Sequence, residues 1–198
     1  MTDEQWAASS LCEGSTVRDT AIHTAWHIHL KRIGPVPSFG YARDVSQFLL
    51  LGGTKFDARQ RERDGARSNE DLIDWIASPA KSTLTNLGEL MIHQQDARRP
   101  LGLGRVIPAD RLASLLSYCM SPIGGGGLGV GCGSYKLGRE FHLVATDIGW
   151  SGGQGLEVRG PGEAILMAIN GRSEATDDLE GSGVEILASR LAAHANRG

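Results

Sequence analysis

Residues 83–97 read TLTNLGELMIHQQDA, and this stretch predicts an amphipathic helix. One side of it would pack in the core, and the other side carries candidate functional residues. On a helical wheel the apolar residues cover one broad side: Leu84, Leu87, Leu90, Met91 and Ile92. Glu89 and His93 are four residues apart on the other side, and Asp96 follows three residues later along the same stripe. A helix with so wide an apolar side is expected to be largely buried, which leaves its polar stripe little water to face.

The Glu89–His93 pair has the spacing of two metal ligands. A carboxylate and an imidazole one turn apart can both reach a divalent ion at about 2.0–2.2 Å. A third ligand must come from elsewhere, and an earlier predicted helix offers His23 or His27, whereas His29 would point away from His23. The same stripe is also what an exposed polar helix face looks like. Spacing alone therefore leaves open both the site and the choice of third ligand.

Further helices are predicted on either side of this segment. Thr16 and Asp19 have the spacing of a capping box, and the helix that they begin is stopped by Gly34-Pro35. Other helical stretches are residues 41–51, residues 68–76 and a segment that runs from Pro108 to Met120. Residues 1–122 are therefore expected to form a helical region, the one that contains the candidate metal ligands.

The pattern changes at residues 124–133, GGGGLGVGCG, where regular structure is disfavoured because glycine loses the most backbone entropy on ordering. No Gly-Lys-Ser/Thr follows this run, so we expect a connection over residues 123–138 and not a phosphate-binding loop. Residues 139–198 are expected to form a small α+β region. Its predicted elements are strands at 140–146 and 155–159 with a glycine-rich turn at 152–153, a helix opened by Pro161, and a helix at 184–195. The predicted fold class is therefore mainly α.

Composition and charge exclude several classes of protein. The 198 residues carry a formal net charge of -3, which gives no electrostatic case for binding nucleic acid or a membrane surface. The basic residues of segment 59–67 alternate with acidic ones, which is typical of a solvated helix face. The N-terminus, MTDEQWAASS, lacks the apolar stretch of a signal peptide, and three scattered cysteines make no disulfide framework. A cytoplasmic location with reduced thiols is expected.

Three segments then resemble, in the right order, the mycothiol-dependent maleylpyruvate isomerase family of the DinB-like superfamily. Residues 11–23, LCEGSTVRDTAIH, are similar to its N-terminal signature, a Gly-Trp-Thr-Val-Arg-Asp run before a metal-binding histidine, with Ser15 in place of the tryptophan. Residues 89–102, ELMIHQQDARRPLG, resemble the second signature, which completes the metal site. Residues 145–172 are similar to its C-terminal region.

The resemblance implies a DinB-like four-helix bundle that holds one divalent metal ion, zinc in the first place and nickel in the second. Its ligands would be His23, Glu89 and His93, with His27 as a neighbour. Three protein ligands leave an open position, as in catalytic sites, and the family would fill it with the thiol of mycothiol. Arg18 and Arg98 are candidates for binding that cofactor or a carboxylate substrate, and Asp96 is a candidate for orienting His93.

The function that follows is a metal-dependent isomerase or S-transferase in which the ion activates a low-molecular-weight thiol or a water against a small electrophile. No catalytic residue is assigned, and the oligomeric state stays open, a homo-oligomer included. The alternative is a non-catalytic metal- or ligand-binding protein for sensing or stress response, built on the same bundle. A purely structural protein, in which the polar stripe is only a surface, is the third hypothesis.

Overall fold

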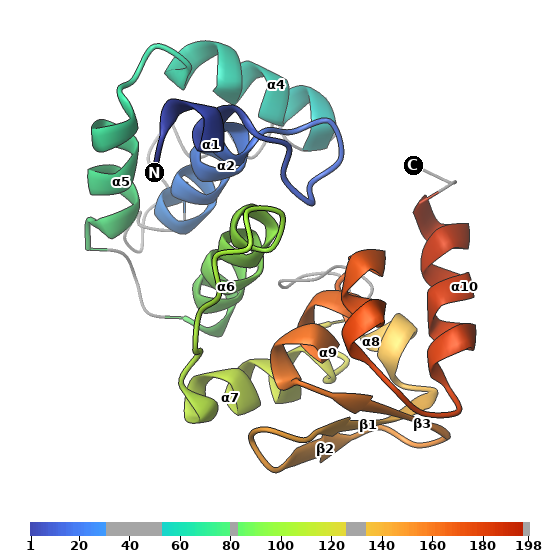
Figure 1. Cartoon of the computed structure of the whole chain (residues 1–198). Coiled ribbons are helices and arrows are strands. Elements are labelled where there is room, and N and C mark those ends of the chain that lie inside the picture. The colour runs from blue at the N-terminus through green and yellow to red at the C-terminus, as the bar shows by residue number, and fades with distance from the viewer. Residues whose placement is uncertain (31–52, 80–82, 126–133, 196–198) are drawn as a thin grey trace. The chain divides into compact units, whose positions relative to one another are not determined.

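The computed structural model describes residues 1–30, 53–79, 83–125 and 134–195. Within these residues the chain is mainly helical and contains a small three-stranded sheet, as the sequence predicts. The chain divides into two compact units (Figure 1). We call Met1–Gly104 the N-terminal unit and Arg105–Gly198 the C-terminal unit.

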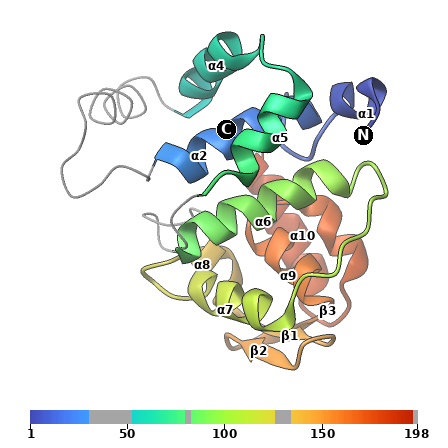
Figure 2. The same cartoon turned by 90° about the vertical axis from the view of Figure 1, so that its left-hand side faces the viewer.

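The N-terminal unit is helical throughout its described part. Its elements are α1 (Asp3–Ala7), α2 (Val17–Leu30), α4 (Gly53–Asp64), α5 (Asn69–Ala77) and α6 (Leu84–Arg98). Helix α2 is central, since it contacts α1, α4, α5 and α6 (Figure 2). Within this unit, α6 is the helix most extensively packed against α2.

Side chains cap the starts of three helices, and the sequence predicts the first of these caps. The backbone N–H of Thr16 donates to Asp19 Oδ2 (2.9 Å) and the N–H of Asp19 donates to Thr16 Oγ1 (3.1 Å), a complete capping box. Ser68 caps α5, and Thr83 caps α6. The helix predicted over residues 41–51 and the Gly34-Pro35 stop lie outside the described residues.

The buried side of α6 differs from the expected apolar side. Met91 and Ile92 are buried as expected, but Leu84 is 41% exposed. The buried positions of α6 are instead Asn86, Gly88, Met91, Ile92, Gln95 and Asp96. Buried polar groups need hydrogen-bond partners, and Asn86 finds one by donating from Nδ2 to the carbonyl of Ile28 on α2 (3.3 Å). The helix thus turns part of its polar stripe inward.

The C-terminal unit packs helices on one side of its sheet (Figures 1 and 2). Its elements are α7 (Ala109–Cys119), α8 (Ser134–Gly138), β1 (Phe141–Ala145), β2 (Trp150–Gly152), β3 (Leu156–Gly160), α9 (Gly162–Ile169), the 3-10 helix η1 (Ser173–Asp178) and α10 (Val184–Ala195). Strand β1 is central, antiparallel to β2 and parallel to β3. The strand predictions hold for β1 and β3, whereas β2 occupies part of the expected turn.

Helix α9 forms the centre of this unit. All six residues from Ala164 to Ile169 are fully buried, as expected for a helix that is apolar on every side. Helix α7 presents Leu112, Leu115, Leu116 and Cys119 at helical spacing and packs against α9. The division between the units therefore falls after Gly104, whereas the sequence suggested residue 122.

The expected connection over residues 123–138 is only partly described. Residues 134–138 form the short helix α8, which packs on α9, and residues 126–133 lie outside the described part. Among the described helices, none combines the length and apolarity that crossing a membrane requires.

Candidate metal centre

Three side chains converge between α2 and α6. His23 comes from α2, and Glu89 and His93 come from α6; one donor atom from each lies within 4.8 Å of the other two. Glu89 Oε2 and His93 Nε2 are 3.4 Å apart. Two ligand atoms on a tetrahedral ion at about 2.1 Å would be separated by about 3.4 Å. This pair therefore fits a zinc-sized ion as it stands.

Both imidazoles are held from behind by carboxylates. Asp96 Oδ2 lies 2.8 Å from His93 Nδ1, and Asp57 Oδ1 of α4 lies 3.1 Å from His23 Nδ1. Because each carboxylate takes up Nδ1, the other nitrogen, Nε2, is left for a ligand. Metal-binding histidines commonly have this arrangement, with a carboxylate fixing the tautomer and the orientation of the ring.

His27 completes a cluster of three imidazoles. The rings of His23 and His27 have centroids 4.1 Å apart, and those of His23 and His93 are 4.5 Å apart. His27 Nδ1 is 3.9 Å from Glu89 Oε2, and its Nε2 is buried without a hydrogen-bond partner in the described part of the chain. Together with His23 and Asp57, it forms another group that could hold an ion. The clustering of the three rings was not evident from sequence spacing.

Burial and proximity shift the charges of this cluster strongly. Burial, followed by the charge of His23, lowers the pKa of His27 to about 4, so this ring is neutral at pH 7. Burial raises the pKa of Glu89, but the hydrogen bond from His93 and the surrounding histidine charges outweigh it and lower the pKa to about 2. Burial lowers the pKa of His93, yet hydrogen bonds with Asp96, Cys12 and Glu89 raise it well above its ordinary value.

The ionised Glu89 and the protonated His93 form a charge-assisted hydrogen bond. A carboxylate accepts but cannot donate, so the Nε2 proton of His93 is what joins the ring to Glu89 Oε2 without a metal. A divalent cation at the same point would take over that role, because both atoms then present lone pairs to it. The donor set is therefore chemically suited to an ion.

A small polar cavity opens beside His23 and His93. Its volume is about 150 Å³, and it is lined by Cys12, Glu13, Ser15, Asp19, Thr20, His23, Asp57, Gln60, Arg61 and His93. At about 30 Å³ per water it holds roughly five water molecules. It can therefore admit water molecules or the reacting end of a ligand.

Arg61 brings a guanidinium to this cavity, whose lining also includes the carboxyl groups of Glu13, Asp19 and Asp57. Its Nη1 donates to the carbonyl of Gly14 (3.3 Å) and to Ser15 Oγ (3.4 Å), and it lies 3.9 Å from Asp19 Oδ2. The basic segment 59–67 is thus not only a solvated helix face, since Arg61 reaches the candidate site.

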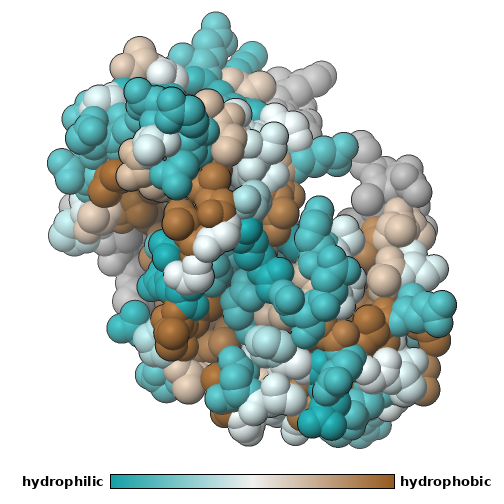
Figure 3. All heavy atoms as spheres, in the orientation of Figure 1, coloured by the Kyte–Doolittle hydropathy of each residue, from teal (hydrophilic) through white to brown (hydrophobic). Residues whose placement is uncertain are grey.

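A second, apolar cavity of about 480 Å³ is also lined by His93. Its lining comes from α1, α2, α5 and α6 and from Met1, and includes Trp6, Val17, Ile73, Ile76, Leu90, Ala97 and Arg98. Apolar side chains gather near α1 and α5 in Figure 3. The volume falls within the range of about 300–1,000 Å³ that is usual for small-ligand pockets.

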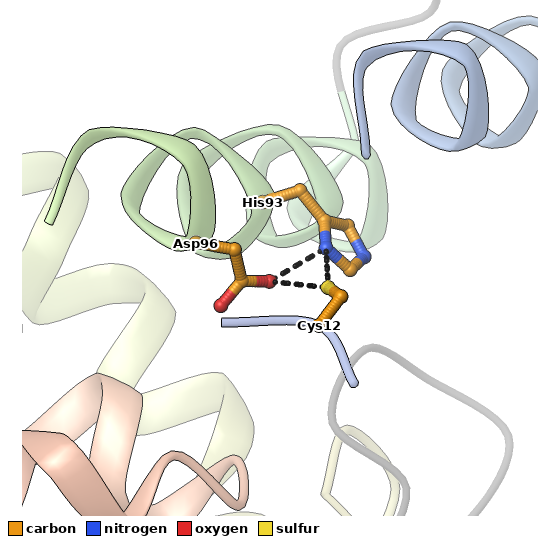
Figure 4. Close-up of side chains that lie close together, drawn as sticks. All are labelled: Cys12, His93 and Asp96. Carbon is orange, nitrogen blue, oxygen red and sulfur yellow. Dashed lines mark hydrogen bonds and ion pairs between the residues drawn. The ribbon is translucent and has the colours of Figure 1, made fainter. Parts of the chain in front are cut away.

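The segment that precedes α2 brings Cys12 to the site. Cys12 Sγ donates to Asp96 Oδ2 (3.1 Å) and lies 3.5 Å from His93 Nδ1 (Figure 4). The side chain of Asp96 is fully buried, so this thiol and His93 help to satisfy a carboxylate that water cannot reach. Cys12, His93 and Asp96 form a third group that could hold an ion.

The two arginines predicted to bind the cofactor are bonded within the N-terminal unit. Arg18 donates from Nε to Asn69 Oδ1 (3.1 Å) and from Nη2 to the carbonyl of Arg67. Arg98 donates to the carbonyls of Leu103 (3.1 Å) and Gly104 (2.9 Å). Their role towards a thiol stays a prediction, although Arg98 does line the apolar cavity.

The structure brings together His23, Glu89 and His93, and it places Asp96 on His93 as predicted. Asp57 and Cys12 were missed as parts of the site. Asp57 is 34 residues from its partner His23, and Cys12 is 84 residues from Asp96, so local periodicity holds no signal for either contact. Only the packing of α4 and of the segment before α2 creates them.

The chain was also compared with known proteins: no family model, no curated protein and no solved structure matches it.

Proposed function

We propose that the N-terminal unit is a divalent-metal site, zinc first and nickel second, that serves a thiol-dependent isomerase or S-transferase. His23, Glu89 and His93 would be the ligands. The observation that carries the proposal is the convergence of their three donor atoms within 4.8 Å in a part-buried cluster. A DinB-like four-helix bundle and the use of mycothiol belong to the same proposal, and the sequence signatures at residues 11–23 and 89–102 support them.

Three protein ligands leave a tetrahedral ion one position for an exogenous ligand. A divalent ion held there would supply Lewis acidity and lower the pKa of a bound thiol or water. The small polar cavity adjoins two of the ligands, His23 and His93, so it gives that position an access route. Its volume of about 150 Å³ suits a thiol group and the atoms next to it.

The chain's own residues would position the reactants. Asp57 and Asp96 fix the two imidazoles through Nδ1, which would leave Nε2 of each ring to hold the ion. Arg61 places a guanidinium at the polar cavity, where an anionic group of the thiol or of the electrophile would bind. The apolar cavity, which His93 also lines, has room for the apolar part of a small electrophile.

The test is thiol coordination to a cobalt-substituted protein, carried out in a Cys12→Ser background so that the thiol of Cys12, which lies next to His93, adds no signal. We expect mycothiol to produce a thiolate-to-cobalt charge-transfer band and thiol-dependent turnover on a panel of small electrophiles. His23→Ala should abolish both. His142→Ala, a histidine on β1 of the C-terminal unit, is the matched control and should change neither.

A cobalt-loaded protein that shows neither the band nor thiol-dependent turnover would overturn the enzymatic part of the proposal. It would favour the alternative of a metal-binding protein without catalysis. A chain that takes up no cobalt would overturn the proposal as a whole.

A further inference from the structure

The Nδ1 side of His93 carries a second set of metal-ligating atoms. Cys12 Sγ, Asp96 Oδ2 and His93 Nδ1 form a triangle with sides of 3.1, 3.5 and 2.8 Å (Figure 4). A thiolate, a carboxylate and an imidazole are all established zinc ligands, and the sulfur biases such a set towards softer ions. This triangle shares only His93 with the proposed centre.

The distances suit an ion after a small adjustment. A sulfur at about 2.3 Å and a nitrogen at about 2.0 Å from a tetrahedral ion are about 3.5 Å apart, which equals the Sγ–Nδ1 separation of Cys12 and His93. The two distances to Asp96 are shorter because hydrogen bonds now span them. They would open by about 0.5 Å on binding.

Cys12 is held in place by the backbone around it. The N–H of Leu11 donates to the carbonyl of Asp96 (3.0 Å), and the N–H of Ser15 donates to the carbonyl of Cys12 (3.0 Å). Gly14 has a φ of +66°, a conformation that glycine adopts without strain. The turn therefore presents the thiol to Asp96 and His93 without help from an ion.

The two nitrogens of His93 make the two positions exclusive. A neutral imidazole has one protonated nitrogen and one lone pair. With the lone pair on Nε2, the Nδ1 proton is donated to Asp96 Oδ2 at 2.8 Å; with the lone pair on Nδ1, the Nε2 proton has Glu89 Oε2 as its acceptor at 3.4 Å. Each tautomer thus has a carboxylate ready to stabilise it.

We infer that the chain holds a single ion in either of two positions, one on Nε2 of His93 with Glu89 and His23, and one on Nδ1 with Asp96 and Cys12. The inference rests on the proposed function, because both positions use His93. Binding at the second position releases the thiol proton of Cys12 to solvent. The ion then has the chain's own thiolate in place of an external thiol, which makes this position a resting state of the centre.

Cobalt uptake and absorption distinguish the two positions. The wild-type chain should bind one equivalent of Co²⁺. His23→Ala should still bind one equivalent and show an intense thiolate-to-cobalt band, because the ion moves to Cys12. Cys12→Ser should bind one equivalent without that band, and the double variant should lose tight binding. Cys119→Ser, which removes a buried thiol of the C-terminal unit, is the matched control and should equal the wild type.

A second variant, Glu89→Gln, tests the same shift of the ion in case His23→Ala does not fold. Glu89→Gln removes the ligand charge of the first position but keeps an oxygen that can accept the Nε2 proton, so it should also raise the thiolate band. Circular dichroism of each variant checks that the helices are intact.

If folded His23→Ala and Glu89→Gln show no thiolate band while Cys12→Ser binds cobalt, the second position is overturned and the proposed function stands. If Cys12→Ser loses cobalt while His23→Ala keeps it, the proposed function is overturned instead. Two equivalents bound to the wild type would overturn the exclusivity of the two positions.

Discussion

The two units of the chain differ in what they bury. In the described part, the N-terminal unit buries seven polar or charged side chains: Thr20, Thr24, Gln60, Asp64, Asn86, Gln95 and Asp96. The C-terminal unit buries only Ser134 among its described residues, around an α9 that is apolar on every side. Burying a polar group without a hydrogen-bond partner destabilises the folded state, whereas burying an apolar group stabilises it.

Several of the buried polar side chains of the N-terminal unit lie at the candidate metal centre. Thr20 and Gln60 line the polar cavity, and Asp96 contacts both His93 and Cys12. Three of the seven buried polar side chains of the described N-terminal unit therefore belong to the candidate metal centre or to the cavity beside it. The C-terminal unit has the interior of a region whose buried side chains serve stability.

The largest effect on stability is expected in the C-terminal unit. Leu166→Ala removes a fully buried side chain from α9 and should lower the free energy of unfolding by about 3 kcal/mol. Urea unfolding followed by circular dichroism measures this loss. Zinc affinity, measured by titration calorimetry under native conditions, should not change. A parallel loss of zinc affinity would contradict the separation of roles between the units.

Asp96→Asn tests the polar interior of the N-terminal unit. The amide cannot hold the Nδ1 proton of His93 as the carboxylate does, so zinc affinity should fall by about 10- to 100-fold. Competition with a zinc chelator gives the ratio. Asp110→Asn, at an exposed position on α7, is the matched control and should keep the wild-type affinity. Equal zinc affinities for both variants would contradict a role of Asp96 in metal binding.

Asp64 provides a polar contact that serves stability within the same unit. It accepts from Trp26 Nε1 (2.9 Å), Arg67 Nε (2.7 Å) and Arg63 Nε (3.1 Å), and its side chain is 6% exposed. Burial raises its pKa, but these hydrogen bonds outweigh burial and lower the pKa below its ordinary value. Asp64→Asn should therefore cost about 2 kcal/mol at pH 7.

The pH dependence of that loss follows from the lowered pKa. The stabilisation from Asp64 is complete above about pH 4, the range in which the unfolded carboxyl is ionised, and is lost as the pH falls through the folded value. The unfolding free energies of wild type and variant should therefore converge in acid. A difference that stays constant down to pH 2 would mean that the contact does not depend on the charge.

The smallest effect is expected for Arg98→Met. Two hydrogen bonds from Arg98 to the carbonyls of Leu103 and Gly104 are lost, so the unfolding free energy should fall by about 1 kcal/mol. Mycothiol affinity of the cobalt protein should change less than about twofold. A larger loss of thiol affinity with unchanged stability would instead support the role in cofactor binding that the sequence suggested.

Local signals predicted much of the fold. The capping box at Thr16 defines the start of α2, and the apolar stretch after Pro161 defines α9. The sequence did not predict which side of α6 is buried, because its buried polar groups find partners on α2 and on the segment before α2 that a helical wheel of α6 alone cannot show. It also assigned α7 to the first region, since packing on α9 is a long-range contact.

The sequence also predicted part of the candidate site, namely its three proposed ligands. Glu89 and His93 follow from helical spacing, and His23 was selected over His27 by resemblance. Asp57 and Cys12 depend on segments far apart in the chain, so their contacts with the histidines follow only from the folded structure.

The most direct test of the account is the zinc content of the purified chain and of His93→Ala, after reconstitution with zinc and exhaustive dialysis. His93 contributes to both positions of the ion, so the account predicts close to one equivalent in the wild type and less than about 0.1 in the variant. A wild-type chain with less than about 0.2 equivalents, or a folded variant that retains as much zinc as the wild type, would contradict it.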